Sequence, residues 1–256
     1  MIRLLALLPL VLLTAPLQAQ QKPVLVPDVS QRSVRILYSF TGAELLLFGA
    51  IVYPGGRPPG PEEPVDIVVV VKGPTESVLV REKERVAGIW VNAEQLRYRS
   101  APSFYAVASS RPLEQLVDER TRAIYELGLE SLQLSPASSA PSEQQGRFQR
   151  GLVEVKSRTG LYYTDSQAVE ITGGVLYRAR LLIPARVPVG RFTAETFLIR
   201  DGRVLAAAVR PIDIQKAGFE RFVATAAERS SVLYGLTAVA MSLALGWAAA
   251  WAARRL

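Results

Sequence analysis

The middle of the chain alternates apolar and polar residues with a period of two, which is the pattern of half-buried β-strands. Breakers rich in Gly, Pro and Asp separate these runs, and the Asp201-Gly202 pair between two of them is typical of a β-hairpin. We predict strands over residues 33–40, 44–53, 65–71, 77–81, 86–91, 104–109, 169–171, 175–183, 191–200 and 204–214. Many short strands joined by turns predict a mostly β fold: an immunoglobulin-like β-sandwich with two or three helices and a C-terminal transmembrane helix.

Two helices are predicted between the strands. The first begins after Arg111-Pro112, and its apolar side would consist of Leu113, Leu116, Val117, Ile124 and Leu127. The second begins at Ser142, where Ser-Glu-Gln-Gln resembles a capping box, and it would bury Phe148, Leu152 and Val155. The Ser/Pro/Ala segment 135–141 either divides two subdomains or crosses the surface of one. Because each half alone offers few strands, we favour one unit.

Both ends of the chain are strongly apolar. Residues 1–19 combine Arg3, an apolar run and a small residue before polar ones, and they predict a secretory signal peptide, with an uncleaved anchor as the alternative. Residues 232–253 carry no charge and would span about 33 Å as a helix, enough to cross a bilayer. Cationic residues favour the cytoplasmic side, so Arg254-Arg255 place residues 254–256 in a cytoplasmic tail.

The two ends predict the same topology, because export by the signal peptide and the basic tail both place the middle of the chain outside the cytoplasm. We therefore expect a periplasmic β-rich domain over 20–215, an amphipathic stalk over 216–231 and a single pass through a bacterial inner membrane. Small residues recur every fourth position within the span, at Ala238, Ser242, Gly246 and Ala250. Such a line lets a second helix approach, which predicts a homodimer or a membrane-protein partner, unless it only reflects abundant Ala.

The amino-acid composition excludes several classes of catalytic and binding site. The net charge of +7 comes from 30 basic and 23 acidic residues without a basic cluster, which argues against nucleic-acid binding. The chain has no His and no Cys, so it lacks the usual general base, thiol nucleophiles and the commonest transition-metal ligands. No phosphate-binding loop, dinucleotide fingerprint or serine-hydrolase elbow occurs either. We therefore predict a protein that is not an enzyme and has no cofactor and no metal site.

Four charged residues are candidates for interaction. Glu44 precedes the apolar run 45–50, which we expect to be buried on both faces, and it would accept an Arg or simply be exposed where the strand begins. Arg178 and Arg180 share the polar face of the strand over 175–183, and we expect Glu195 to form a cross-strand ion pair with one of them. The aromatic residues Trp90, Tyr98 and Tyr162-Tyr163 either form a binding surface or belong to the core and its rim.

Three segments resemble the alphaproteobacterial transmembrane protein family, a group with a signal peptide and one C-terminal span. These are Ser39 to Ala50, Leu182 to Gly190 and the stalk residues Gly218-Phe219-Glu220. The resemblance covers nearly the whole chain. It implies an inner-membrane protein that accompanies sulfite-exporter-like permeases, and it brings no catalytic residues with it.

These observations leave three hypotheses. The leading one is a non-enzymatic, single-pass inner-membrane protein that presents a periplasmic interaction domain as an accessory to a membrane transporter. The second is a periplasmic sensor or chaperone that binds small anions through Arg178 and Arg180. The third is a carboxylate-based envelope hydrolase that uses Glu44 and Glu195, since glycosidases need only two acids.

Overall fold

Two β-sheets form the body of the protein. The computed structural model describes residues 22–30, 33–36, 42–60, 63–216, 223 and 226–254. The expected signal peptide lies outside these residues, and so does most of the expected stalk. The smaller sheet has the order β1 (Val24–Val29), β3 (Gly42–Val52), β11 (Leu176–Pro184) and β10 (Val169–Thr172). The larger has the order β2 (Ser33–Ile36), β13 (Arg203–Lys216), β12 (Gly190–Arg200), β4 (Asp66–Lys72), β7 (Tyr105–Ser109) and β9 (Tyr162–Asp165).

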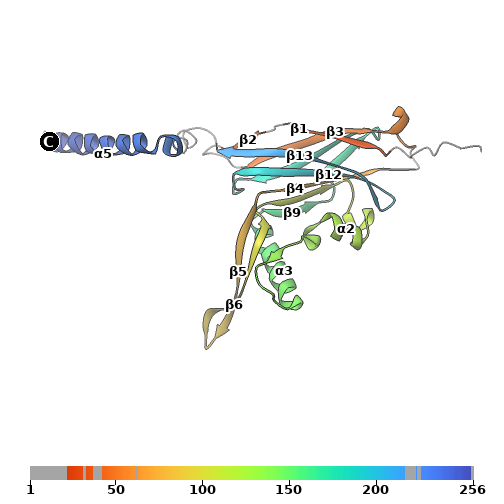
Figure 1. The fold of residues 1–256 in the computed structure, drawn as a ribbon, viewed down its shortest axis with the longest axis horizontal. Helices are drawn as coiled ribbons and strands as arrows, with labels where there is room; N and C mark the ends of the chain where they lie inside the picture. The colour runs from red at the N-terminus through yellow and green to blue at the C-terminus, as the bar shows by residue number, and fades with distance from the viewer. Residues whose placement is uncertain are drawn as a thin grey trace, which may run out of the picture.

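The two sheets pack face to face, which confirms the predicted sandwich (Figure 1). Strand pairs are antiparallel except at the two edges of the larger sheet, where β2 runs parallel to β13 and β9 runs parallel to β7. The core between the sheets includes Leu45, Leu47, Ile51, Ile67, Val69, Ala179, Leu181, Ile183, Phe192 and Leu198. The period-two pattern therefore identifies the inward residues of both sheets.

Strand β3 differs from its prediction. The apolar run 45–50 is expected to be buried on both faces, but only its inward residues Leu45, Leu47 and Gly49 are buried, while Phe48 is exposed. The reason is that no other element of the described chain covers the outer face of the smaller sheet. Strand β4 is the one buried on both faces, because all five residues from Ile67 to Val71 are inaccessible to solvent.

The second face of β4 is covered by helices. Val68 and Val70 pack with Tyr105 and Phe197 beneath α1 (Leu113–Leu116) and α2 (Glu119–Tyr125). The predicted continuous helix is thus two short ones, because Val117 is extended and Asp118 caps α2 by accepting the amide of Thr121 at 2.8 Å. Leu113, Leu116, Val117 and Leu127 are buried as predicted, whereas Ile124 is 61% exposed.

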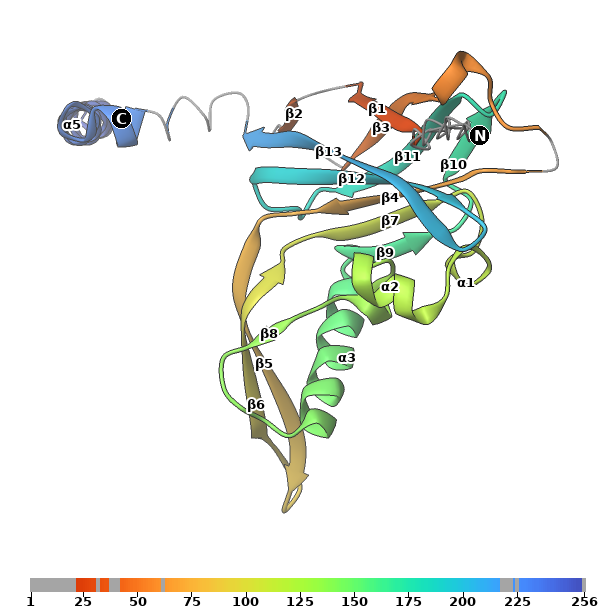
Figure 2. The ribbon, with the colours of Figure 1, turned by 45° about the vertical axis from the view of Figure 1, so that its right-hand side comes forward.

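A long hairpin leaves the sandwich where β4 ends, and we call it the arm (Figure 2). It consists of β5 (Thr75–Val86) and β6 (Ile89–Pro102), joined at Ala87-Gly88, which both have positive φ. Sequence analysis predicts only residues 77–81 and 86–91 as strands, because the charged residues between them hide the period of two. The strand predicted over 86–91 is in fact the turn and its two flanks.

Helix α3 (Ser142–Arg158) packs along the arm and buries Phe148 and Leu152 against Leu96 and Tyr98. The predicted burial of Val155 is wrong, because this side chain is 59% exposed on the outer side of the helix. The helix begins at Ser142 as predicted, but the capping box is absent, because Pro141 is the N-cap and no side chain caps the helix. The segment before α3 contributes β8 (Ser135–Pro136), which pairs with β6.

Helix α5 (Ser231–Ala253) is long and apolar enough to cross a membrane over Ser231–Trp251, and none of this window is buried against the rest of the described chain. An apolar helix that finds no protein to cover it requires another apolar environment, which a lipid bilayer provides. The C-terminal span predicted over 232–253 therefore corresponds to α5.

Substitution of Gly49 tests how tightly the sandwich is packed at this position. A Cβ at Gly49 would lie 2.5 Å from the carbonyl oxygen of Val26 and 2.6 Å from the hydroxyl of Tyr177. We expect Gly49→Ala to lower the free energy of unfolding by about 1–3 kcal/mol, as overpacking does. Gly151→Ala on α3 is the matched control, because its Cβ would meet open space. That change should stabilise the helix by about 0.5–1 kcal/mol. Urea unfolding of the full chain in detergent micelles measures both, and equal effects would contradict the packing.

Candidate functional site

Three of the four candidate residues lie together on the outer face of the smaller sheet. Strands β3 and β11 pair so that Arg180 stands opposite Leu46, and its Nε approaches Oε1 of Glu44 to 3.7 Å. Arg178 is paired with Glu170 across β10 and β11, and it donates from Nε at 2.8 Å and from Nη2 to the same carboxylate oxygen. The hydrogen bond from Arg178 lowers the pKa of Glu170. Both arginines of this face are therefore already opposite carboxylates.

Glu195 is not on this face, so its predicted ion pair with Arg178 or Arg180 is wrong. It lies in β12, between Val70 of β4 and Val209 of β13. The error has a topological cause. Strands β11 and β12 follow each other in sequence, but the turn between them crosses from one sheet to the other, so they do not pair.

The centre of the same outer face is apolar. Val26, Phe48, Ala50 and Leu176 from three neighbouring strands line an open hollow of about 360 Å³, with Asp28 beside Phe48 at its edge. Val24 and Val52 continue this surface along β1 and β3. We call these six apolar residues the outer apolar face. An exposed apolar surface with a charged rim is typical of a site that contacts another protein or a membrane. The sequence pattern does not reveal this surface, because the outward residues of β3 are as apolar as its inward ones and are therefore predicted to be buried too.

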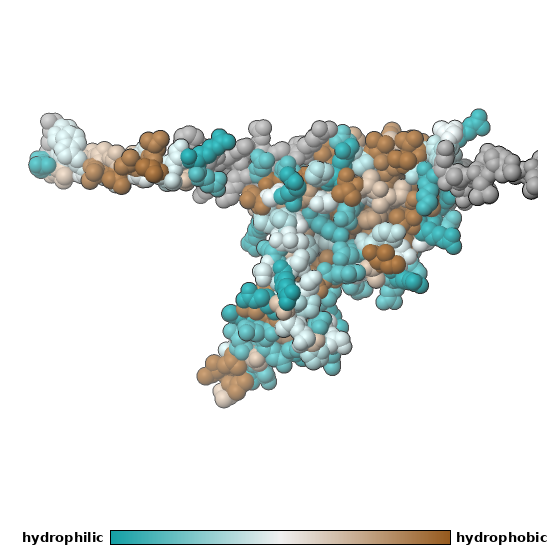
Figure 3. Space-filling view, in the orientation of Figure 1, coloured by the Kyte–Doolittle hydropathy of each residue, from teal (hydrophilic) through white to brown (hydrophobic). Residues whose placement is uncertain are grey.

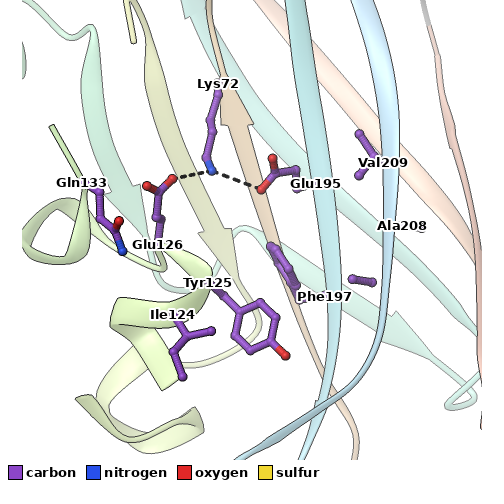
Figure 4. A pocket seen from close by; sticks show the side chains of 10 residues that line it. Lys72, Ile124, Tyr125, Glu126, Gln133, Glu195, Phe197, Ala208 and Val209 are labelled. Carbon is purple, nitrogen blue, oxygen red and sulfur yellow. Dashed lines mark hydrogen bonds and ion pairs between the residues drawn. The ribbon is translucent and has the colours of Figure 1, made fainter. Parts of the chain in front are cut away.

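A second hollow, of about 310 Å³, lies between α2 and the larger sheet (Figure 4). Lys72 occupies its centre, with Nζ 2.7 Å from Glu126 and 3.2 Å from Glu195. Lys72 ends the buried strand β4, and Glu126 is the C-cap of α2 in a left-handed conformation. Apolar side chains around this cluster include Tyr125, Phe197 and Val209. A lysine directly after five consecutive buried apolar residues is the sequence signal that would have pointed to it.

The protonation of Lys72 decides what this cluster can do. Partial burial alone would lower its pKa, but the hydrogen bond that Lys72 donates to Glu126 and the charges of Glu126 and Glu195 outweigh it, so the pKa of Lys72 is raised. A lysine held protonated is neither a general base nor a nucleophile. Each carboxylate in turn already has a cation beside it. The arrangement therefore suits a structural ion cluster that ties α2 to the sheet.

Tyr105 holds the backbone next to this ion cluster through its hydroxyl group. Its buried hydroxyl donates to the carbonyl of Glu126 and accepts the amide of Gly128 at 3.2 Å. Burial raises the pKa of Tyr105, which keeps the phenol protonated as a donor. No group of three or more Asp and Glu side chains converges as a metal site would require in the part of the chain that the structure describes.

The four small residues of the span lie along one line of α5, as residues four apart do in a helix. The hydroxyl of Ser242 donates to the carbonyl of Ala238 at 2.9 Å, so it is satisfied within the helix. The line of Ala238, Ser242, Gly246 and Ala250 is therefore smooth and apolar. Dimerisation or partner binding through it stays a prediction.

Comparison with known proteins supports the membrane assignment. A family model described as "Putative transmembrane protein" matches residues 24–255. The chain belongs to this family. Membership agrees with the single C-terminal span of α5 and extends through both sheets and the arm. The resemblance drawn from the sequence is confirmed.

No curated protein sequence matches the chain. Among solved structures, the sporulation control protein Spo0M from Bacillus subtilis aligns with 8% identity and a TM-score of 0.32. The alignment covers 82% of this chain and 56% of that chain, so the match spans little more than half of Spo0M.

Lys72→Met tests the ion cluster. It leaves Glu126 and Glu195 partly buried without a cation between them, and we expect it to lower the free energy of unfolding by about 1–2 kcal/mol. The double variant Lys72→Met/Glu195→Gln should recover part of this loss, because it removes one of the facing charges. Lys83→Met, an exposed lysine on the arm, is the control and should change stability by less than about 0.5 kcal/mol. Equal effects at Lys72 and Lys83 in urea unfolding would rule out a structural role for the cluster.

Proposed function

We propose that the protein is a non-enzymatic, single-pass inner-membrane protein whose periplasmic β-sandwich binds a membrane-protein partner. The outer apolar face is the observation that supports this proposal. It combines a group of exposed apolar side chains with charged residues along its border, where Phe48 stands next to Asp28 and Arg178, as in interfaces whose core is apolar and whose edge is polar. A non-enzymatic role agrees with the ion cluster at Lys72, where every charge has a partner.

A membrane transporter is the class of partner that we propose. Such a protein has a lipid-embedded part that α5 can contact and an extracytoplasmic surface that the sandwich can contact. Tethering by α5 raises the effective concentration of the outer apolar face near any protein of the same bilayer, so even a modest interface suffices for binding.

The geometry does not favour the two alternatives. A site for free anions needs cationic groups without partners, yet Arg178 and Arg180 each face a carboxylate. A glycosidase needs two carboxyl groups on either side of one bond. Glu44 and Glu195 lie in different sheets, and Glu195 is engaged by Lys72.

The partner can be tested by site-specific photocrosslinking in intact membranes. A photoreactive amino acid at Phe48 should give one discrete adduct whose second component is an integral membrane protein, identified by mass spectrometry. The same group at Val155, an exposed position on α3, is the control and should not give this adduct. Leu176→Glu should reduce the Phe48 adduct at least fivefold, because a buried charge without a partner opposes association. Adducts only with a second copy of the chain, or only with lipid, would contradict the proposal.

The topology can be tested by reporters fused after Leu256. We expect green fluorescent protein to be fluorescent and alkaline phosphatase to be inactive at this position, because Arg254-Arg255 hold the end of α5 in the cytoplasm. An alkaline phosphatase fusion before α5, after Lys216, should be active. The reverse activities would refute a periplasmic sandwich.

A further inference from the structure

The tip of the arm is apolar and fully presented to solvent. Ile89 and Trp90 are 69% and 66% exposed, and Val86 and Val91 beside them are exposed as well. Ala87 and Gly88 form the turn, so the six residues at the tip carry no charge. Figure 3 shows hydrophobic residues gathered at this end of the arm, set off from the hydrophilic surface along its length.

One cation stands beside the tryptophan and another behind it: Arg85 pairs with Trp90 and its Nε donates to the turn carbonyl of Gly88 at 3.4 Å, whereas Lys83 lies two residues further from the tip. Residues paired across a hairpin share a face, so the pairs Arg85↔Trp90 and Lys83↔Asn92 place two cations and the indole on one face of the arm. The pairs Val86↔Ile89 and Glu84↔Val91 place the aliphatic side chains and one carboxylate on the other. Exposed aliphatic side chains and an indole at the tip, with Arg85 beside them and Lys83 further back, have the composition of a segment that lies in a bilayer interface, where the apolar groups enter the lipid and the long basic side chains reach the phosphates.

The arm is braced along its length. Arg147 of α3 contacts Glu82 of β5, with 3.3 Å between Nε and the carboxylate, and it also hydrogen-bonds Glu94 of β6. Phe148 and Leu152 pack against the arm closer to the sandwich. The tip therefore extends beyond a pair of strands that α3 holds in place. This arrangement favours contact of the tip with another surface over packing of the tip against the protein itself.

The arm and the membrane tether leave the same end of the sandwich. Gly190 pairs with Ile214 near the end of β13, and a Cβ at Gly190 would lie 3.0 Å from Pro74 at the root of the arm. Twelve residues of β5 extend about 40 Å at roughly 3.3 Å per residue. Of the 14 residues 217–230 between β13 and α5, residues 226–229 are helical, so the segment can span at most about 42 Å. The tip can therefore reach the bilayer that holds α5.

We propose that the tip of the arm inserts into the interface of the bilayer that anchors α5. The protein would then hold its membrane at two points, which would fix the orientation of the sandwich relative to the lipid. This proposal goes beyond the proposed partner function, because it concerns a different surface and a lipid ligand. It stands whether or not the outer apolar face binds a transporter.

Trp90 is a built-in probe of this contact. The chain has three tryptophans, so Trp247→Phe/Trp251→Phe leaves Trp90 as the only one. This full-length variant is reconstituted into nanodiscs of phosphatidylethanolamine and phosphatidylglycerol, with or without bromine on the acyl chains. We expect blue-shifted emission and at least twofold quenching by the brominated lipid. Adding Ile89→Asp should shift the emission to the red and abolish the quenching. Ile89, Trp247 and Trp251 are all exposed, so these substitutions should leave the fold of the protein intact.

The control places a tryptophan at another exposed apolar position. Ile124→Trp, with the three native tryptophans changed to Phe, reports on α2 and should not be quenched. Equal quenching at positions 90 and 124 would mean that the whole domain lies on the bilayer, and it would overturn insertion of the tip. Blue-shifted but unquenched emission from Trp90 would place the tip in a protein pocket, and red-shifted, unquenched emission would leave it in water. Either result overturns the proposal.

Discussion

Burial of β4 on both faces is the constraint on which the rest of the structure depends. Its odd-numbered residues, Ile67, Val69 and Val71, join the core between the two sheets, and its even-numbered ones, Val68 and Val70, join a second core under α1 and α2. One strand thus fixes both the sandwich and the helical layer. At its end, Lys72 enters the ion cluster, and the chain passes through Gly73, where a Cβ would lie 2.6 Å from the hydroxyl of Ser103. The arm begins directly after this narrow point.

Several charged residues of the protein form ion pairs that stabilise its own structure. Lys72 joins two carboxylates in the cleft, Arg111 holds the buried Asp66, and Arg147 braces the arm through Glu82 and Glu94. A cation or carboxylate that is paired within the protein is less able to bind a ligand. The surfaces for which we propose contacts are mainly apolar: the outer apolar face, the tip of the arm and α5. A chain held in a membrane has neighbours, both lipid and protein, that can cover such surfaces.

The proposed contacts divide between different parts of the fold. The smaller sheet offers the outer apolar face to a protein, the arm offers its tip to lipid, and α5 crosses the bilayer. Because the root of the arm and the end of β13 are adjacent, a tether and an inserted tip would restrain the sandwich from the same end. Such a restraint would hold the outer apolar face in one orientation relative to the other proteins of the membrane. Less rotational entropy would then be lost when a partner binds.

The sequence by itself determined the strands with clear alternation, the inward face of β11, the helix at α3 and the membrane span, because each depends on hydrophobic periodicity within one segment. It did not reveal β1 or β9, whose short runs carry weak patterns, nor the length of the arm, whose charged residues 81–85 mask the alternation. Only the tertiary structure decided which strands share a sheet. That choice separated Glu195 from Arg178 and Arg180, joined Lys72 with Glu126, and left Phe48 exposed, because strand pairing and the coverage of a face depend on contacts between residues far apart in the chain.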